Sequence, residues 1–311
     1  MRIVYMGTPD IAVPCLRFLA ESKHEVVGVL TQPDRPKGRG HHTIPTPVKA
    51  AALEYDIPVY QPLSLRKGED AATALETLRQ LAPDLIVVLA YGQLLPKEVL
   101  ELPKYRCINL HASLLPAYRG AAPIQWVILN GETKTGVTAQ QMAEGLDTGD
   151  MLLTSETPVG ARETAGELFD RLAQSGAELL TETLVRLNEI TPRPQNDAES
   201  CYAHMLDKKM AVIDWSKSAR ELDCLVRGLN PWPIALTSLA GERLKIYAAE
   251  QTNGCGEPGT VLEADPKKGL TVACGEGALT LTEIQLVGGK RMKATDFLRG
   301  HAVEKGSRLG E

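Results

Sequence analysis

The chain has 311 residues, of which 43% are hydrophobic and 23% charged, and its formal net charge is −5. This length predicts about two domains, and the hydrophobic fraction is enough for ordinary globular cores. The net negative charge argues against a protein that coats nucleic acid non-specifically. No apolar run approaches the ~20 residues that a membrane helix needs.

The charge is unevenly distributed along the chain. Residues 207–311 hold 15 Lys and Arg against 14 Asp and Glu, whereas residues 1–206 hold 19 against 25. This small basic bias of the C-terminal third leaves room for RNA binding there but does not establish it.

The N-terminal two-thirds alternates between strand-like and helix-like segments. Strands are expected at residues 2–6, 25–31, 85–89 and 107–111, with a further pair at 135–142 and 151–157. Amphipathic helices are expected at 11–21 and 69–81, and a capping box formed by Thr164 and Glu167 opens a long helix to about Glu189. This alternation predicts an α/β, Rossmann-like domain with a mostly parallel sheet, whose ligands bind beyond the carboxyl ends of the strands. Because the chain starts with a strand and a turn, we expect no signal peptide.

A second domain is expected after a polar, proline-rich connection. Residues 191–206 are interpreted as a linker, and a short helix follows at 219–228, ending at a C-cap-like Gly228. Short β-type runs then occur at 234–239, 244–249, 260–263, 270–273 and 279–284. Their spacing predicts a small barrel or sandwich. We therefore divide the chain into domains 1–190 and 207–311, and expect the second to be an OB-like β-barrel.

Several cofactor and metal motifs are missing or incomplete. The six cysteines, at positions 15, 107, 201, 224, 255 and 274, form no Cys-x-x-Cys pair and are expected to be reduced core thiols of a cytoplasmic protein. The turn at residues 7–10 lacks two glycines of the dinucleotide fingerprint, so a nicotinamide cofactor is not expected. His41 and His42 have no third ligand, and we expect no metal.

Asn109, His111 and Asp147 form the most informative constellation. Asn109 and His111 leave the strand 107–111 on the same face, because alternate residues of a strand share a face. A hydrogen-bond donor, an imidazole and a carboxylate that orients it suit acyl transfer to a substrate that brings its own amine. From spacing alone, other interpretations remain open: a structural histidine, an asparagine that fastens a loop and an aspartate that shapes a turn.

Four segments together resemble the motifs of the folate-dependent formyltransferases, and the resemblance extends over the whole chain. They are residues 6–9, 109–116, 118–123 and 145–149. The resemblance implies 10-formyltetrahydrofolate as formyl donor and no metal. Residues 32–40, the run that ends at Trp126 and the segment 230–233 further imply that the acceptor is the α-amino group of methionyl-initiator tRNA. A cytoplasmic monomer is expected.

The resemblance also implies roles for individual residues. Asn109 would donate to the oxyanion, His111 would add a second hydrogen bond and help move a proton to folate N10, and Asp147 would orient His111 and favour its protonated form. The folate pocket is expected near two segments: Tyr91, Gly92, Gln93 and Leu94, and, with more weight, Ser113, Leu114, Leu115 and Pro116. The leucines of these segments also suit a plain apolar core, and both interpretations can hold.

Two basic segments are the expected tRNA contacts. The loop 34–49 carries Arg35, Lys37, Arg39 and Lys49 against Asp34, and Arg39 is the expected contact to the acceptor end of tRNA. His41, His42 and Thr43 stand where many relatives carry lysines, which suggests a weaker or pH-dependent phosphate contact. Lys290, Arg291 and Lys293 fall in a turn that either faces the tRNA or is an ordinary solvated turn. A solvated surface loop is also the simplest interpretation of residues 34–49.

Three rival functions fit parts of the sequence. The first is formyl transfer to a small amine such as glycinamide ribonucleotide or an amino-sugar nucleotide; transfer to glycinamide ribonucleotide would not need the C-terminal β-domain. The second is a hydrolase that releases formate from the same donor and needs no basic loop. The third is a non-catalytic RNA-binding protein, which the intact Asn109, His111 and Asp147 argue against.

Overall fold

The computed structural model describes residues 1–37 and 42–311. These residues pack into two compact units. Unit 1 comprises Met1–Gly120, Lys134–Pro158 and Phe169–Ala203, and unit 2 comprises Ala121–Thr133, Val159–Leu168 and His204–Glu311. Unit 2 thus takes in two segments that lie between parts of unit 1 in the sequence, so the packing units are not continuous stretches of the chain.

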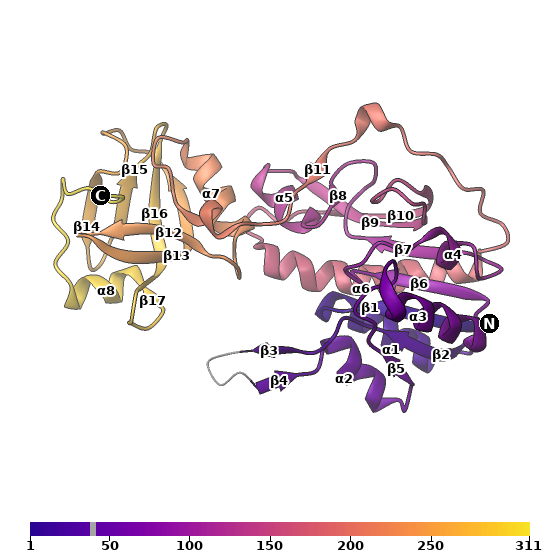
Figure 1. Cartoon of the computed structure of the whole chain (residues 1–311). Coiled ribbons are helices and arrows are strands. Elements are labelled where there is room, and N and C mark those ends of the chain that lie inside the picture. The colour runs from indigo at the N-terminus through magenta and orange to yellow at the C-terminus, as the bar shows by residue number, and fades with distance from the viewer. Residues whose placement is uncertain (38–41) are drawn as a thin grey trace. The chain divides into compact units, whose positions relative to one another are not determined.

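Unit 1 is built on a seven-stranded sheet in the order β10-β9-β7-β6-β1-β2-β5 (Figure 1). The strands are β1 (Arg2–Gly7), β2 (Glu25–Leu30), β5 (Val59–Tyr60), β6 (Leu85–Leu89), β7 (Cys107–His111), β9 (Lys134–Gln141) and β10 (Asp150–Pro158). The pairs β1–β2, β1–β6, β2–β5 and β6–β7 are parallel, whereas β9 is antiparallel to β7 and β10 to β9. The prediction of a mostly parallel sheet, including the closing strand pair, is confirmed.

Helices cover both faces of this sheet. They are α1 (Val13–Glu21), α2 (Pro47–Glu54), α3 (Gly68–Leu81), α4 (Lys97–Leu100) and α6 (Ala165–Val185). Val4 and Met6 of β1 share a core with Leu78 of α3, as expected for alternate residues of a strand buried on both faces. The predicted capping box opens α6, since Glu167 N–H donates to Thr164 Oγ1 (3.3 Å) and Thr164 N–H to Glu167 Oε2 (2.9 Å). This helix ends at Val185, before the expected Glu189.

Unit 2 contains an antiparallel sheet in the order β12-β13-β16-β15-β14, with β17 paired to β16. The strands are β12 (Ala235–Leu239), β13 (Glu242–Thr252), β14 (Val261–Asp265), β15 (Gly269–Ala273), β16 (Ala278–Leu286) and β17 (Met292–Lys293). Three helices belong to the same unit: α5 (Pro123–Leu129), α7 (Ala219–Gly228) and α8 (Ala294–Gly300). Trp215, Leu222 and Phe297 are buried in its core.

The C-terminal segment joins the two edges of this sheet. Leu309 pairs with Leu239 of β12, and Arg308 pairs with Thr260 beside β14. Leu309 N–H donates to Gly259 O (2.9 Å), and Gly310 N–H donates to Ser238 O (3.0 Å). Because one segment bonds to both edge strands, the sheet closes into a small barrel, in agreement with the predicted β-barrel.

Two local features differ from expectation. Gly228 is the last residue of α7 rather than a left-handed cap, and a Cβ there would lie 2.8 Å from Leu129 Cγ. A glycine at this position therefore suits the close packing of α7 on α5. The sequence pattern does not predict α8, and the basic segment 290–293 leads through β17 directly into this helix.

The cysteines are free thiols, as expected, but not all lie in a core. Cys15, Cys107, Cys224 and Cys274 are buried, whereas Cys201 and Cys255 are exposed. Burial raises the pKa of Cys15 and of Cys107 to about 12, so neither thiol ionises near neutral pH. Among the described residues, no helix combines the length and apolar character required to cross a membrane.

Candidate active site

The carboxyl end of β7 carries the first two predicted site residues. Asn109 and His111 are 7% and 6% exposed, and on the neighbouring β9 they pair with Gln140 and Thr138. Residues directly opposite each other in an antiparallel pair share a face. One buried face at this end of the sheet is therefore lined with polar side chains.

His111 contacts an acceptor through each ring nitrogen. Its Nδ1 lies 3.5 Å from Asp147 Oδ1, and its Nε2 lies 2.8 Å from the carbonyl oxygen of Tyr118. A carbonyl can only accept, so Nε2 carries a proton, and Asp147 faces Nδ1 favourably when that nitrogen is protonated too. The ring is thus held between the Asp147 carboxylate and the Tyr118 carbonyl.

Asp147 is fixed by two further donors. Gly120 N–H donates to its Oδ2 (2.9 Å), and Gln140 Nε2 donates to its Oδ1 (3.2 Å). Its backbone is left-handed, with φ +53°, a conformation that Asp tolerates better than most residues. The structure thus brings the three predicted residues together. Gln140 connects them, because it pairs with Asn109 across the sheet and donates to the Asp147 carboxylate, which faces His111.

The Asn109 carboxamide differs from its neighbours because it makes no hydrogen bond to any residue in the described part of the chain. The side chain is nevertheless largely removed from water. Its amide atoms keep some access to solvent, because they are not among the fully enclosed polar atoms that lack a partner. The carboxamide can therefore bond to a molecule that enters the site without giving up a contact within the protein.

Sequence reasoning missed four groups that contact this trio: the Tyr118 carbonyl, the Gly120 N–H, Gln140 and Gln195. Gln140 had a detectable signal, because a glutamine within a strand expected to be buried is unusual. The two backbone groups lie in the segment 118–123, which the sequence singles out only by its resemblance. Gln195 lies in the proline-rich segment interpreted as a linker, where nothing local indicates a role.

The folate segment Ser113–Pro116 follows β7 directly. Ser113 is fully buried, and its hydroxyl donates to Ala117 O (2.7 Å), so the side chain closes the turn. Thr138 Oγ1 donates to Ser113 O and accepts from Leu115 N–H. Leu115 is buried, whereas Leu114 and Pro116 are partly exposed. Leu114 and Pro116 are thus the members of this segment with surface to offer a ligand.

The other folate segment, Tyr91–Leu94, lies at the same edge of the sheet, since Val88 of β6 pairs with Asn109 of β7. Tyr91 is 1% exposed and its ring packs in the core, so only its backbone could contact a ligand. Its carbonyl accepts hydrogen bonds from Thr8 Oγ1 and Gln32 Nε2. Gly92 and Leu94 are exposed. Gln93 bonds to the Pro62 carbonyl and the Leu65 N–H, which holds the turn in place.

The basic loop is partly a hairpin. β3 (Arg35–Lys37) pairs with β4 (His42–Ile44), and Arg35 is exposed. Arg39, the expected tRNA contact, lies outside the described residues, as do Gly38, Gly40 and His41. Lys49 belongs instead to α2, where its Nζ lies 2.5 Å from Asp34 Oδ2.

The Asp34–Lys49 pair should stabilise the fold in a pH-dependent manner. The hydrogen bond from Lys49, assisted by one from Gln61, lowers the pKa of Asp34. The pair therefore stabilises the fold fully at pH values above the unfolded-state pKa of about 3.9, and this stabilisation is lost as the pH falls through the folded-state pKa. Asp34→Asn should reduce the free energy of unfolding by about 0.2–1 kcal/mol near neutral pH. Urea unfolding of both proteins across a pH series checks this; an equal difference at neutral and strongly acidic pH would contradict it.

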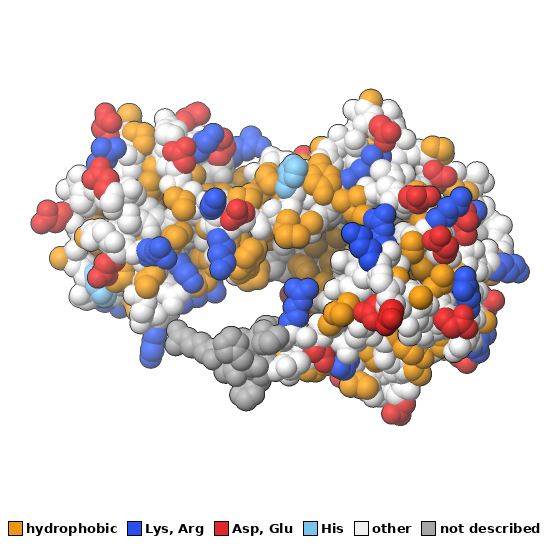
Figure 2. Space-filling view, in the orientation of Figure 1, with side chains coloured by type: hydrophobic (Ala, Val, Ile, Leu, Met, Phe, Trp, Pro, Cys, Tyr) orange, Lys and Arg blue, Asp and Glu red, His pale blue; other side chains and the backbone are white. Residues whose placement is uncertain are grey.

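The second basic segment belongs to unit 2 and is only partly free. The Arg291 guanidinium is paired with Glu283 and lies 4.3 Å from the Tyr247 ring centroid, although its side chain remains exposed. Lys290 and Lys293 are exposed, with no ion-pair partner within the residues that the structure describes. Figure 2 shows acidic and basic side chains interspersed over the drawn face of each unit, rather than one continuous basic patch.

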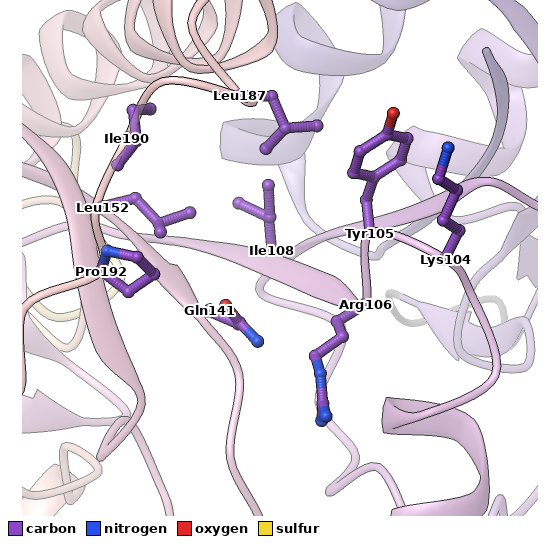
Figure 3. A pocket seen from close by; sticks show the side chains of 9 residues that line it. All are labelled: Lys104, Tyr105, Arg106, Ile108, Gln141, Leu152, Leu187, Ile190 and Pro192. Atoms are coloured by element: carbon purple, nitrogen blue, oxygen red, sulfur yellow. The ribbon is translucent and has the colours of Figure 1, made fainter.

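A separate pocket of about 230 Å³ lies in unit 1 (Figure 3). Its walls are Lys104, Tyr105, Arg106, Ile108, Gln141, Leu152, Leu187, Ile190 and Pro192. Ile108 precedes Asn109 on β7 and therefore points to the opposite face. No predicted site residue lines this pocket, so it is distinct from the Asn109–His111–Asp147 site.

The fold and the site are those of an α/β enzyme that transfers formyl groups. The chain belongs to the formyl transferase family, whose model matches residues 1–184. The model of the formyl transferase C-terminal domain matches residues 205–302. Among curated proteins, the chain is 52% identical over 313 residues to the methionyl-tRNA formyltransferase of Citrifermentans bemidjiense, covering 100% of this chain and 97% of that protein. It is 54% identical over 308 residues to the methionyl-tRNA formyltransferase of Clostridium novyi, covering 98% of each.

A solved structure supports the fold at lower sequence similarity. The N-formyltransferase from Helicobacter canadensis, in complex with folinic acid and dTDP-3-aminofucose, aligns with a TM-score of 0.68 and 19% identity. The alignment covers 94% of this chain and 100% of that one. At this identity the likeness concerns the fold alone.

Proposed function

We propose that this chain transfers the formyl group of 10-formyltetrahydrofolate to the α-amino group of methionyl-initiator tRNA, which provides N-formylmethionyl-tRNA for translation initiation. Full-length relatives at about half identity are named methionyl-tRNA formyltransferases. The observation that carries the chemistry is the unpaired Asn109 amide beside the His111–Asp147 pair, at the carboxyl edge of the sheet.

We propose the following roles for the trio. The acceptor nitrogen attacks the formyl carbon, the new C–N bond forms, the bond to folate N10 breaks, the amine loses a proton and N10 gains one. Asn109 donates its amide N–H to the formyl oxygen, where negative charge develops. His111 adds a second hydrogen bond, gives its Nε2 proton to N10 as the bond to the formyl carbon breaks, and takes up the amine proton in its place. Asp147 holds the ring in place for both tasks.

His111 can act in this way only after one of its present contacts is exchanged. Its Nε2–H is bonded to Tyr118 O, and its Nδ1 faces Asp147. Since Asp147 is itself fixed by Gly120 and Gln140, we propose that the Tyr118 carbonyl gives way to substrate. The ring then keeps its orienting carboxylate and presents a donor to the reacting atoms.

The residues present fit a folate. Its pterin needs an apolar slot with a few backbone hydrogen-bonding groups. Leu114 and Pro116 offer apolar surface after β7, and Leu94, 43% exposed, offers it after β6. We propose that these residues, with the backbone of Tyr91, Gly92 and Gln93, line the donor site, while Ser113 and Leu115 shape the turn.

The tRNA is proposed to contact both basic segments. Arg35 and Lys37 belong to strand β3 of the hairpin, whose base is fastened by Asp34, Lys49 and Gln61, and Arg39 is the proposed contact from the residues outside the described part of the chain. We further propose that residues 1–190 carry the chemistry, that 207–311 hold the tRNA, and that the enzyme acts as a cytoplasmic monomer.

The direct test is incubation of the purified protein with 10-formyltetrahydrofolate and methionyl-initiator tRNA. N-formylmethionine is measured after ester hydrolysis, and free formate is measured without tRNA. Formylmethionine that depends on the charged tRNA supports the proposal. Formate without tRNA would indicate a hydrolase, and absence of both products would direct the search to small amines such as amino-sugar nucleotides.

Removal of two free cations should weaken tRNA binding in a salt-dependent manner. In Lys290→Ala/Lys293→Ala we expect the slope of log Kd against log salt to fall by about 1 for each phosphate that the protein no longer neutralises. Lys305→Ala, which removes an exposed cation elsewhere in unit 2, is the matched control. Equal slopes for the double variant and the control would exclude this surface.

A further inference from the structure

We propose that Gln195 is a positioning residue, which holds the turn that carries Asp147 against His111. This inference rests on the proposed function, since it assigns a part in that reaction to the segment between α6 and unit 2. After α6 this segment runs around the sheet outside its edge strand β10 and returns to β11 (Tyr202–Ala203) (Figure 1).

The side chain of Gln195 bonds to the backbone of the Asp147 turn. Its Nε2 donates to Asp147 O (2.8 Å) and to Gly149 O (2.7 Å), and lies 3.5 Å from Gln140 Oε1. Among residues 191–199, which are otherwise exposed, Gln195 alone is partly buried. One amide therefore fixes two carbonyls of the catalytic turn.

The other end of the same amide is fixed as well. Gln195 Oε1 accepts from Arg119 Nε (2.9 Å), and Arg119 Nη2 lies 2.8 Å from Asp197 Oδ1. Arg119 stands between Tyr118, whose carbonyl binds His111, and Gly120, whose N–H binds Asp147. Gln195 thus joins the two backbone segments that hold the His111–Asp147 pair.

The bonds from Gly120 and Gln140 hold the carboxylate of Asp147, whereas Gln195 holds the backbone of the turn. Residues 143–146 are exposed, and Asp147 has a left-handed backbone. A residue in such a conformation persists when its surroundings fix it. Loss of the Gln195 donor would let the Asp147 carboxylate move relative to His111. The residues that orient metal-ligating histidines provide an analogy, because their mutation typically lowers activity by about 10–100-fold. We expect a similar loss when Asp147 is misplaced.

Gln195→Glu separates the two contacts. A carboxylate still accepts from Arg119, but it donates nothing to the Asp147 and Gly149 carbonyls. Gln195→Met removes both contacts at similar length. Gln80→Glu makes the same change of charge at an exposed position on α3 and is the matched control.

We expect Gln195→Glu and Gln195→Met each to lower kcat by about tenfold or more, while KM for donor and for tRNA changes less than about threefold. Gln80→Glu should match the wild type. Hydrogen exchange of the amides in residues 143–149 should be faster in both Gln195 variants, independently of turnover. Thermal unfolding midpoints close to that of the wild type would exclude a general loss of structure.

The outcomes are distinguishable. A wild-type enzyme without formyl transfer would refute the proposed function, and the exchange measurement would still test the positioning role. Unchanged kcat in Gln195→Glu with a loss only in Gln195→Met would overturn donation by Gln195 in favour of the Arg119 contact. Unchanged kcat and exchange in both variants would overturn the inference altogether.

Discussion

His111→Ala should lower kcat by roughly 10²–10⁴-fold while leaving tRNA binding unchanged, because general acid–base catalysis by a positioned side chain contributes about that much. The buried ring is linked to Asp147 and to Tyr118 O, so its removal takes away both the proton carrier and the group that the surrounding loop is built to hold. Single-turnover formation of formylmethionine, measured alongside the Kd for the charged tRNA, separates catalysis from binding.

His24→Ala is a suitable control, because His24 directly precedes β2 and its ring Nδ1 lies 3.5 Å from the amino terminus, away from the Asn109–His111–Asp147 site. It should retain wild-type turnover. A His111→Ala enzyme with wild-type kcat would show that His111 is a structural histidine. Loss of tRNA binding in parallel with kcat would instead indicate a general structural defect.

Gly120→Ala should both destabilise the protein and slow the reaction by about tenfold or more, the effect expected when an orienting group is displaced. Gly120 has φ +114°, and a Cβ there would lie 2.7 Å from Ala203 O and 2.8 Å from the Tyr202 ring. Strain and overpacking together predict a loss of about 2–4 kcal/mol in the free energy of unfolding. Displacement of this backbone also withdraws the N–H that binds Asp147 Oδ2.

The matched control for this variant is Gly241→Ala. Gly241 also has a positive φ, +78°, but a Cβ there would meet nothing within 4 Å, so only backbone strain of about 1 kcal/mol is expected. Denaturant unfolding and steady-state kinetics of both variants separate strain from steric displacement. Equal effects of the two substitutions on kcat would disprove the role assigned to the Gly120 N–H.

Much of unit 1 is predictable from the sequence because its determinants are local. Strand 85–89 is uniformly apolar, and the capping box at Thr164 and Glu167 marks the start of α6. The two-residue spacing of Asn109 and His111 assigns them to one face of a strand, and both lie buried at the end of β7. The alternation of side chains along a strand and the capping box both depend on residues close together in the sequence, and the folded chain shows both.

The remaining features depend on contacts between distant residues. Gln195 reaches a carbonyl 48 positions away, and nothing in its proline-rich surroundings indicates that partner. The segment Pro123–Leu129 belongs to unit 2 because α5 packs on α7, although it lies between strands of unit 1 in the sequence. Likewise, the sequence alone does not show that Arg291 is paired with Glu283 and lies over the Tyr247 ring.

The closure of the barrel by residues 306–311 has a consequence for biosynthesis. These residues follow every strand of unit 2, so the outer edge of β14 stays unpaired on the ribosome until the closing segment emerges, and the outer edge of β12 is paired only at Leu236, with Val212 and Ile213. Exposed edges of this kind template pairing with other chains. Nascent chains and C-terminally clipped forms should therefore be prone to aggregate. Glu311 also takes part in the closure, since Ser238 Oγ donates to its carbonyl oxygen (2.8 Å).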